Sequence, residues 1–264
     1  MKCASSIGIA VIVVVLAGCV SAPSVPPVAP PPTEHPPVPA YDIRFPPYEQ
    51  AFSDQWQRGE TYAREILALL QKRGITQTHA RFVTAIVFPE LTRYNRTQDF
   101  FEAAANSLSV RSSHPKNYSI GVMQMTPQFA VDVERELARH TDLQELYRDI
   151  NYYGDTATTH CRRERIKRIR DKDCQISYLL CFLDVFLRLY ETDIATWQSD
   201  ADNIYTDSIC LAYAATAYNA GMYRGIERYE WFMTQFGFPY GGGDSRSHWN
   251  YRTIAESWWR MDGR

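Results

Sequence analysis

The sequence predicts a mostly α-helical fold, in which one domain follows an N-terminal leader and a proline-rich segment. Beyond residue 48 apolar residues recur with the period of an α-helix, and no convincing run alternates in the manner of a strand. The chain has 264 residues, of which 45% are hydrophobic, and this suits a single domain of roughly 200 residues plus an extension. A formal net charge of −2 argues against a nucleic-acid partner, which usually requires a strongly basic face.

The leader, residues 1–18, has the pattern of a secretory signal peptide. One lysine precedes an apolar run of ten residues, from Ile7 to Leu16. As a helix this run would be about 15 Å long. That length is too short for a bilayer core of ~30 Å and is typical of the apolar part of a signal peptide.

Residues 19–48 form the proline-rich segment. Residues 20–48 hold 11 of the 15 prolines in the chain, so helix and sheet are disfavoured there. Extended polyproline II at ~3.1 Å per residue would reach at most about 90 Å. We therefore expect a spacer that holds the domain away from a membrane. A ligand for a proline-binding module is the alternative.

Residues 49–264 form the predicted domain, and several helix ends carry recognisable signals. Ser53 is a candidate cap and Gly74 a stop signal for the first helix. Thr126 is a candidate cap followed by Pro127 at the first helical position, where proline fits. Gly221 is a candidate left-handed cap. The predicted helices cover residues 52–74, 78–88, 98–108, 126–140, 175–191, 208–221, 225–237 and 248–261.

Residues 175–191 are apolar nearly all round, so we expect them to form the buried central helix. Two connecting regions, residues 108–118 and 237–248, are rich in glycine and polar residues. Such loops are often mobile and line clefts, and we expect the same here.

Four cysteines lie in the domain, and an even number in an exported protein permits two disulfides. If Cys174 and Cys181 share one helix, they lie about 10 Å apart along its axis, which exceeds the ~7 Å limit for a bridge. The sets that remain are Cys161–Cys174 with Cys181–Cys210, or Cys161–Cys181 with Cys174–Cys210. Free thiols at Cys181 and Cys210, buried among the apolar side chains of their segments, are the alternative. No short paired spacing indicates a metal site.

Glu90 follows the apolar residues Ile86, Val87 and Phe88, and an unpaired carboxylate is costly to bury. We expect the helix to end at this glutamate. A glutamate at a helix end is usually solvated, and Arg93, three residues on, is a candidate ion-pair partner.

Three segments taken together resemble the lysozyme-like domain of the soluble lytic transglycosylases, glycoside hydrolase family 23. That family has a catalytic glutamate at a helix end, a glycine turn of the form G-[LVF]-[MF]-Q-[ILM]-x-P, and a later Tyr-Asn-Ala-Gly. In this chain they read Glu90, Gly121 to Pro127, and Tyr218 to Gly221. The resemblance covers roughly residues 80–225.

The chain departs from the family pattern at two places. Leu91 stands where the family commonly has serine, and the interval from Glu90 to Gly121 is longer than usual. The departures concern the wall of the cleft near Thr92 and the range of substrates rather than the reaction.

The resemblance implies cleavage of the MurNAc–GlcNAc bond of peptidoglycan strands, with a 1,6-anhydro ring formed and no cofactor or metal. Glu90 would act alone as acid and then base. Its apolar neighbours would raise its pKa and keep it protonated near neutral pH. Tyr218 would hydrogen-bond near Glu90 or the sugar. Gln124 and the backbone around Gly121 would line the cleft and hold the acetamido side. Ser119 and Asn219 would also contribute to substrate binding.

Other residues near these segments have plainer interpretations. We expect Met123 and Met125 to pack in the core, and a turn to be the main role of Asn219. Trp258 and Trp259 are more typical of packing than of sugar stacking. Residues 162–172 carry seven basic side chains, which are more typical of a solvated helix face than of steering toward the carboxylates of peptidoglycan peptides.

Leu16-Ala17-Gly18-Cys19 resembles the lipobox of bacterial lipoproteins. The resemblance implies cleavage before Cys19, acylation of that cysteine and attachment to a membrane. Val20 and Ser21 follow the cysteine. By the sorting habit of such lipoproteins, the absence of aspartate there implies the outer membrane, and we expect the domain to face the periplasm.

Two rival functions stay open at this point. A tethered module that grips peptidoglycan without cutting it is the first, although it has no need of an acid beside apolar residues. A hydrolytic lysozyme is the second, and it would need a second carboxylate such as Asp99 or Asp155. Protease, esterase and nucleotide-binding motifs are absent from the sequence.

Overall fold

The computed structural model describes residues 45–151, 158–197, 203–239 and 247–261, which all belong to one compact unit, Val38–Arg264. Within these ranges the regular structure is helical. Extended pairing there is limited to two isolated bridges, Ile120 with Met125 and Phe238 with Trp249. The mostly α fold class is therefore confirmed.

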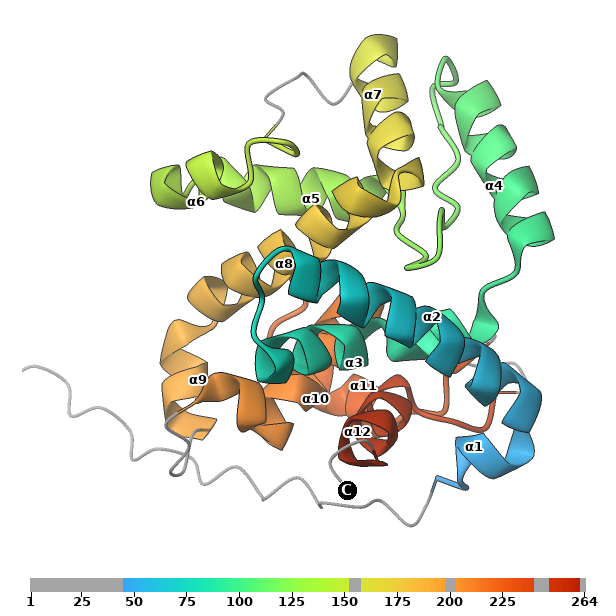
Figure 1. Ribbon diagram of the computed structural model, residues 1–264. Coiled ribbons are helices and arrows are strands. Elements are labelled where there is room, and N and C mark those ends of the chain that lie inside the picture. The colour runs from blue at the N-terminus through green and yellow to red at the C-terminus, as the bar shows by residue number, and fades with distance from the viewer. Residues whose placement is uncertain (1–44, 152–157, 198–202, 240–246, 262–264) are drawn as a thin grey trace, which may run out of the picture. The chain divides into compact units, whose positions relative to one another are not determined.

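The helices form two groups on either side of α8 (Figure 1). On one side α3 packs against α2, α10 and α12, and on the other α7 packs against α4 and α5. Helix α8 contacts members of both groups. The elements are α1 (Tyr48–Ala51), α2 (Ser53–Lys72), α3 (Gln77–Arg93), α4 (Arg96–Ser109), α5 (Pro127–Leu137), α6 (Thr141–Leu146), α7 (Thr159–Arg170), α8 (Lys172–Leu189), α9 (Glu191–Trp197), the 3-10 helix η1 (Ile204–Thr206), α10 (Ser208–Ala220), α11 (Ile226–Met233) and α12 (Tyr251–Met261).

The predicted buried central helix is confirmed as α8. Asp171 caps it by accepting a hydrogen bond from the Cys174 N–H at 2.9 Å. Along its middle, side chains on every face are buried, including Phe182 and Leu183. Because both groups of helices pack against it, no face of this segment is left for solvent, which explains its nearly uninterrupted apolar sequence.

The predicted caps are confirmed at α5 and wrong at α2. Thr126 Oγ1 accepts from the Phe129 N–H at 3.0 Å, with Pro127 at the first helical position. Ser53 is instead the first helical residue after Phe52, and no side chain caps that end. Gly74 and Gly221 both end their helices at positive φ, +81° and +101°, as glycine allows.

Helix α3 does not end at Glu90, contrary to the prediction. It continues through Pro89 to Arg93, although proline lacks the N–H that would bond to the carbonyl one turn earlier. Packing holds this turn in place: the Tyr251 hydroxyl donates to the Ile86 carbonyl at 3.1 Å. Thr92 Oγ1 donates to the Pro89 carbonyl at 2.7 Å. One tertiary hydrogen bond and one local hydrogen bond thus hold the helix through Pro89, against the tendency of proline to terminate it.

The start of the folded unit lies slightly before the predicted boundary at residue 49. Phe45 and Tyr48 are already buried, and the Phe45 ring packs against Phe236 with centroids 4.7 Å apart. The predicted leader, Cys19 and most of the proline-rich segment lie outside the described residues. In the part of the chain that the structure describes, no helix combines the length and apolar character needed to span a bilayer.

All four domain cysteines are free thiols, so both disulfide sets are wrong and the free-thiol alternative is the one observed. Cys161, Cys181 and Cys210 are buried, and Cys174 is partly exposed. Burial raises the pKa of the Cys174 thiol to about 11, with the Asp171 carboxylate adding to the shift. Burial also raises the pKa values of Cys181 and Cys210. Because the thiolate is the reactive form in disulfide exchange, these raised pKa values lower the reactivity of Cys174, Cys181 and Cys210.

A tight turn at Gly121 lies between α4 and α5 and packs against α8. Its φ is +75°, and a Cβ there would lie 2.1 Å from the side-chain nitrogen of Gln175. That buried amide, on α8, donates to the Ile120 carbonyl at 2.7 Å. The Gly121 N–H donates to the carboxylate of Asp99 on α4. Both the positive φ and the close approach require glycine here.

We predict that Gly121→Ala destabilises the protein by roughly 2–5 kcal/mol, because left-handed strain adds to a clash with Gln175. Gly74→Ala is the matched control, since its φ is similar and no atom lies within 4 Å of the added Cβ. The control should cost only about 1–2 kcal/mol. Urea unfolding followed by circular dichroism measures both. Equal losses would show that the turn does not depend on the close approach.

The buried carboxyl group of Glu256, on α12, makes the stability of the fold depend on pH. It lies 3.6 Å from Arg252 and 3.5 Å from Arg260. Burial nevertheless dominates and raises its pKa from 4.5 to about 7, against the opposing effect of the two arginines. Between these values the unfolded chain loses the proton that the folded chain retains, so stability falls as pH rises.

We predict that Glu256→Gln flattens the decline in unfolding free energy between pH 4.5 and 7 by on the order of 3 kcal/mol. The slope is the diagnostic quantity, because the substitution also leaves Arg252 buried without its carboxylate partner. Urea unfolding at several pH values measures it, with the exposed Glu145→Gln as control. A wild-type slope in the Glu256 variant would contradict the prediction.

Candidate active site

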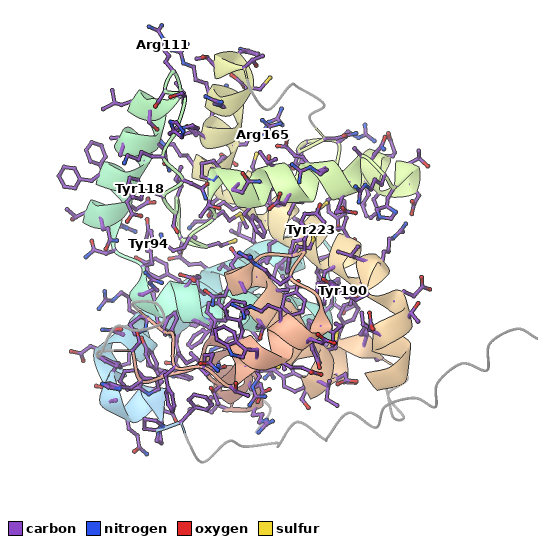
Figure 2. The ribbon with its side chains drawn as sticks, turned by 180° about the vertical axis from the view of Figure 1, so that it is seen from behind. Tyr94, Arg111, Tyr118, Arg165, Tyr190 and Tyr223 are labelled. Atoms are coloured by element: carbon purple, nitrogen blue, oxygen red, sulfur yellow. The ribbon has the colours of Figure 1, made fainter. Side chains whose placement is uncertain are left out.

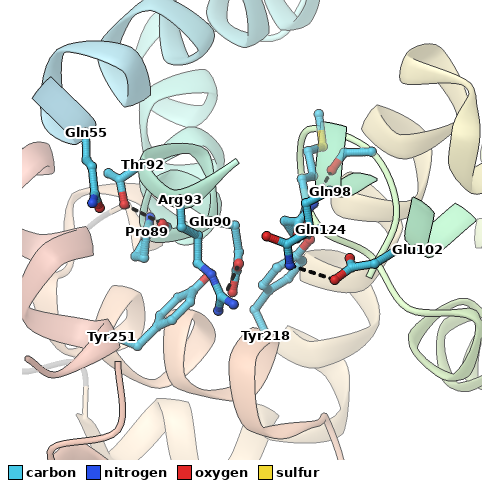
Figure 3. A network of polar contacts seen from close by, with 12 residues as sticks. Gln55, Pro89, Glu90, Thr92, Arg93, Gln98, Glu102, Gln124, Tyr218 and Tyr251 are labelled. Atoms are coloured by element: carbon cyan, nitrogen blue, oxygen red, sulfur yellow. Dashed lines mark hydrogen bonds and ion pairs between the residues drawn. The ribbon is translucent and has the colours of Figure 1, made fainter. Parts of the chain in front are cut away.

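The three segments singled out in the sequence meet at one cavity of about 370 Å³. Glu90 lines it from α3, Ser119 and Gln124 from the segment before α5, and Tyr218 and Asn219 from the end of α10. Figure 3 shows Glu90 with Arg93 and Tyr251 on one side and Gln124 and Tyr218 on the other. The fold therefore brings together residues that lie up to 129 positions apart in the chain.

Glu90 is buried but opens on this cavity, with 7% of its surface exposed. Burial raises the pKa of its carboxyl group, and the charge of Arg93 opposes the shift from 3.7 Å away. Burial penalises the ionised form of the carboxyl group, and this effect is larger than that of the Arg93 charge. The result is a carboxyl group that holds its proton to higher pH than an exposed glutamate and has a nearby cation for its ionised form.

Tyr218 is nearly buried, and its hydroxyl donates to the Met123 carbonyl at 2.6 Å. This hydrogen bond ties α10 to the glycine turn across the cavity. Burial, and then the proximity of the Glu90 charge, raise the pKa of Tyr218 well above its ordinary value. Tyr218, which the resemblance expects to hydrogen-bond near Glu90 or the sugar, is thus a neutral phenol near Glu90 whose proton is directed to the backbone.

Gln124 lies in the left-handed region, with φ of +53°. Its side-chain amide donates to the Gly121 carbonyl at 2.9 Å, which closes the turn. Non-glycine residues adopt such a φ uncommonly, and the strain is typical of positions where a side chain must face a site. The backbone here directs Gln124 to the wall of the cavity that faces Glu90.

Gly121 itself is not among the residues that line the cavity, whereas Ser119 and Gln124 on either side of it are. The reason is that its missing side chain makes room for Gln175, on the side of α8. Met123 and Met125 are buried, as expected, although Met125 also reaches the cavity. Trp258 packs in the core, with its ring stacked 5.0 Å from that of Phe88.

Tyr251 was not found by the sequence analysis. It is buried, and its pKa is raised well above the ordinary value by burial and then by the charge of Glu90 and by Tyr218. Its hydrogen bond to the Ile86 carbonyl holds the helical turn that carries Glu90. No local signal could have found it, because it is one aromatic residue among several in the C-terminal helix.

A second carboxylate, Asp132 of α5, also lines the cavity and was missed. Burial raises its pKa, while Gln128 and Arg135 oppose the shift. It accepts from Gln128 Nε2 at 2.9 Å and from Arg135 Nη1 at 3.2 Å. Asp99, the candidate from sequence, is engaged instead by the Gly121 N–H, and Asp155 lies outside the described residues. Asp132 lies four residues after Gln128, on the same face of α5, and this helical spacing is the signal that could have indicated it.

The described residues contain no group of three or more histidine, cysteine, aspartate or glutamate side chains placed to hold a metal ion. The polar groups that line the cavity are the buried carboxyl group of Glu90, the more exposed carboxylate of Asp132, several side-chain amides, the phenol of Tyr218, two hydroxyl groups and the guanidinium groups of Arg93 and Arg224. Such a set is suited to moving a proton and to hydrogen-bonding a polar ligand such as a sugar.

Comparison with known proteins gives no relative for this chain. No protein-family model, no curated protein and no solved structure matches it.

Proposed function

We propose that this chain is a lytic transglycosylase with a lysozyme-like domain, which cleaves the MurNAc–GlcNAc bond of peptidoglycan and leaves 1,6-anhydro ends. The observation that carries the proposal is the buried carboxyl group of Glu90, with its raised pKa, opening on a cavity lined by Gln124 and Tyr218. These are the residues of the three segments that resemble the family.

In the proposed reaction, Glu90 donates its proton to the oxygen that bridges the two sugars as the C1–O4 bond breaks. The muramic C6 hydroxyl then attacks C1, and Glu90 accepts the hydroxyl proton as the C1–O6 bond forms. No water is consumed, and the intramolecular attack avoids the entropic cost of a bimolecular step.

The surroundings of Glu90 support both halves of this cycle. Burial favours the protonated form needed for the first step. Arg93, at 3.7 Å, stabilises the carboxylate between the two steps. Tyr251 holds the helical turn that carries the acid, and Tyr218 holds the opposite wall, so the reacting group has a fixed position.

A hydrolytic lysozyme is the second candidate, and Asp132 is the observation that favours it. A hydrolase would use this carboxylate to activate water or to stabilise the cation. Its raised pKa and its hydrogen bonds to Gln128 and Arg135 are compatible with that role. A tethered module that binds glycan without cutting it is the third candidate.

We predict that the full-length chain, purified in detergent, releases peptidoglycan fragments lighter by one water than hydrolysis products. Glu90→Gln should lower the rate by about a hundredfold or more, because it removes the acid and base. Asp132→Asn is the comparison variant, and it should retain far more activity than Glu90→Gln. Mass spectrometry of the fragments measures both the rate and the product.

The other outcomes separate the candidates. Reducing-end products that are lost in both variants would make the protein a hydrolase with Asp132 as second carboxylate. Retention of glycan by all three proteins in a sedimentation assay, without release of fragments, would favour the binding module.

We also propose, from the resemblance of residues 16–19 to a lipobox, that Cys19 anchors the protein to the periplasmic face of the outer membrane. Several acyl chains at one cysteine anchor a protein stably, whereas one chain binds only marginally. Cys19→Ala should abolish metabolic labelling with palmitate and move the protein out of the outer-membrane fraction. Cys3→Ala is the matched control. Equal labelling of both variants would refute the anchor.

A further inference from the structure

A second cavity, of about 400 Å³, adjoins the site. Asn117 and Gln128 line both cavities and form the wall between them. The Gln128 N–H donates to Asn117 Oδ1 at 2.8 Å, so this wall is fixed. The cavity lies where α4, α5, α7 and residues 110–117 come together, and Figure 2 shows its lining residue Arg165 near the approach of α7 to α5.

The lining of this second cavity combines apolar and basic side chains. Val110, Pro115, Val131 and Ile166 are among the apolar ones. No acidic side chain lines it. The basic residues are Lys116, Arg135, Arg162 and Arg165.

Two of the four positive charges are already compensated. Arg165 Nε lies 2.6 Å from the Glu134 carboxylate, and Arg135 lies 3.2 Å from that of Asp132. Lys116 and Arg162 pair with no carboxylate in the described ranges. Arg162 donates to the carbonyls of Val110 and Ser112 at 3.0 and 3.1 Å, which orients it without neutralising its charge. The cavity therefore keeps a net positive potential.

The loop that carries Lys116 is held in position, although the sequence suggested a mobile segment. Asn106 of α4 donates to the Tyr118 carbonyl at 2.7 Å and accepts from the Tyr118 N–H at 3.0 Å. The Lys116 N–H donates to Ser109 Oγ at 2.8 Å. A fixed backbone lowers the entropic cost of binding a ligand at this cavity.

We propose that this second cavity binds the acidic peptide carried by the muramic acid of the glycan strand. The proposal rests on the proposed function and deepens it. Small aliphatic side chains of such a peptide suit the apolar lining, and its carboxylates suit Lys116 and Arg162. Adjacency across Asn117 and Gln128 places a peptide within reach of a sugar bound at Glu90. The enzyme would then prefer glycan that bears peptides.

The test uses the full-length chain, peptidoglycan strands with their peptides, and the same strands after an amidase has removed them. Lys116→Glu should raise KM for the peptide-bearing strands by about fivefold or more and change KM for bare strands by less than about twofold. Lys116→Ala should also raise KM for the peptide-bearing strands, but by a smaller factor than Lys116→Glu. Lys167→Glu, on α7 but outside the cavity, is the matched control and should change neither value.

Binding of the free peptide gives a readout that does not depend on cleavage. In a calorimetric titration, wild type and Lys167→Glu should bind the peptide, and Lys116→Glu should bind it at least about fivefold more weakly. Equal KM values on the two substrates, or equal peptide binding by all variants, would overturn the second cavity as a peptide site. If no protein cuts either strand, the proposed function fails, and the titration still decides the peptide site.

Discussion

The site depends on the burial of one carboxyl group in the middle of the helical packing. Glu90 lies on α3, which is enclosed by α2, α10 and α12, and every residue from Val83 to Phe88 on the same helix is buried. Desolvating a carboxylate is unfavourable, so this packing favours the protonated acid. Around it the structure provides one cation, Arg93, and two neutral phenols.

Two constraints hold the opposite wall of the site. At Gly121 the absence of a side chain lets Gln175 of α8 reach the Ile120 carbonyl, so a hydrogen bond from α8 holds the turn. From α10, the Tyr218 hydroxyl donates a hydrogen bond to the carbonyl of Met123, which lies 95 residues earlier in the chain. The strained conformation of Gln124 persists because both contacts fix the backbone around it. A rigid turn of this kind presents a polar side chain to a ligand at little entropic cost.

The electrostatics differ between the two neighbouring cavities. The first contains Glu90 and Asp132, with Arg93 and Arg224 on its lining, so both signs of charge are present. The second has only basic titratable groups on its lining. Asp132 and Arg135 pair across the boundary between them. A ligand with a neutral sugar and an anionic branch would match this difference in charge, with the sugar in the first cavity and the anionic branch in the second.

The sequence by itself determined the helical class, the buried central helix, the cap at Thr126 and the three segments that meet at the site. The first three features depend on period and on cap chemistry, which are local properties of the chain, whereas the three segments were identified by their resemblance to a family. The burial of Met123 and Met125 also agrees with the expectation from the sequence.

Only the tertiary structure decided the continuation of α3 through Pro89, the contribution of Tyr251 and Asp132, the free state of the cysteines and the second cavity. Each depends on which side chains meet across distant segments. The sequence predicted a helix end at Glu90, just after Pro89, whereas the hydrogen bond from Tyr251 to the Ile86 carbonyl helps to hold the helix beyond it. The spacing of the cysteines permitted bridges, but packing directs Cys181 and Cys210 into the core. Periodicity identifies which face of a helix is buried, whereas packing selects the partner that buries it.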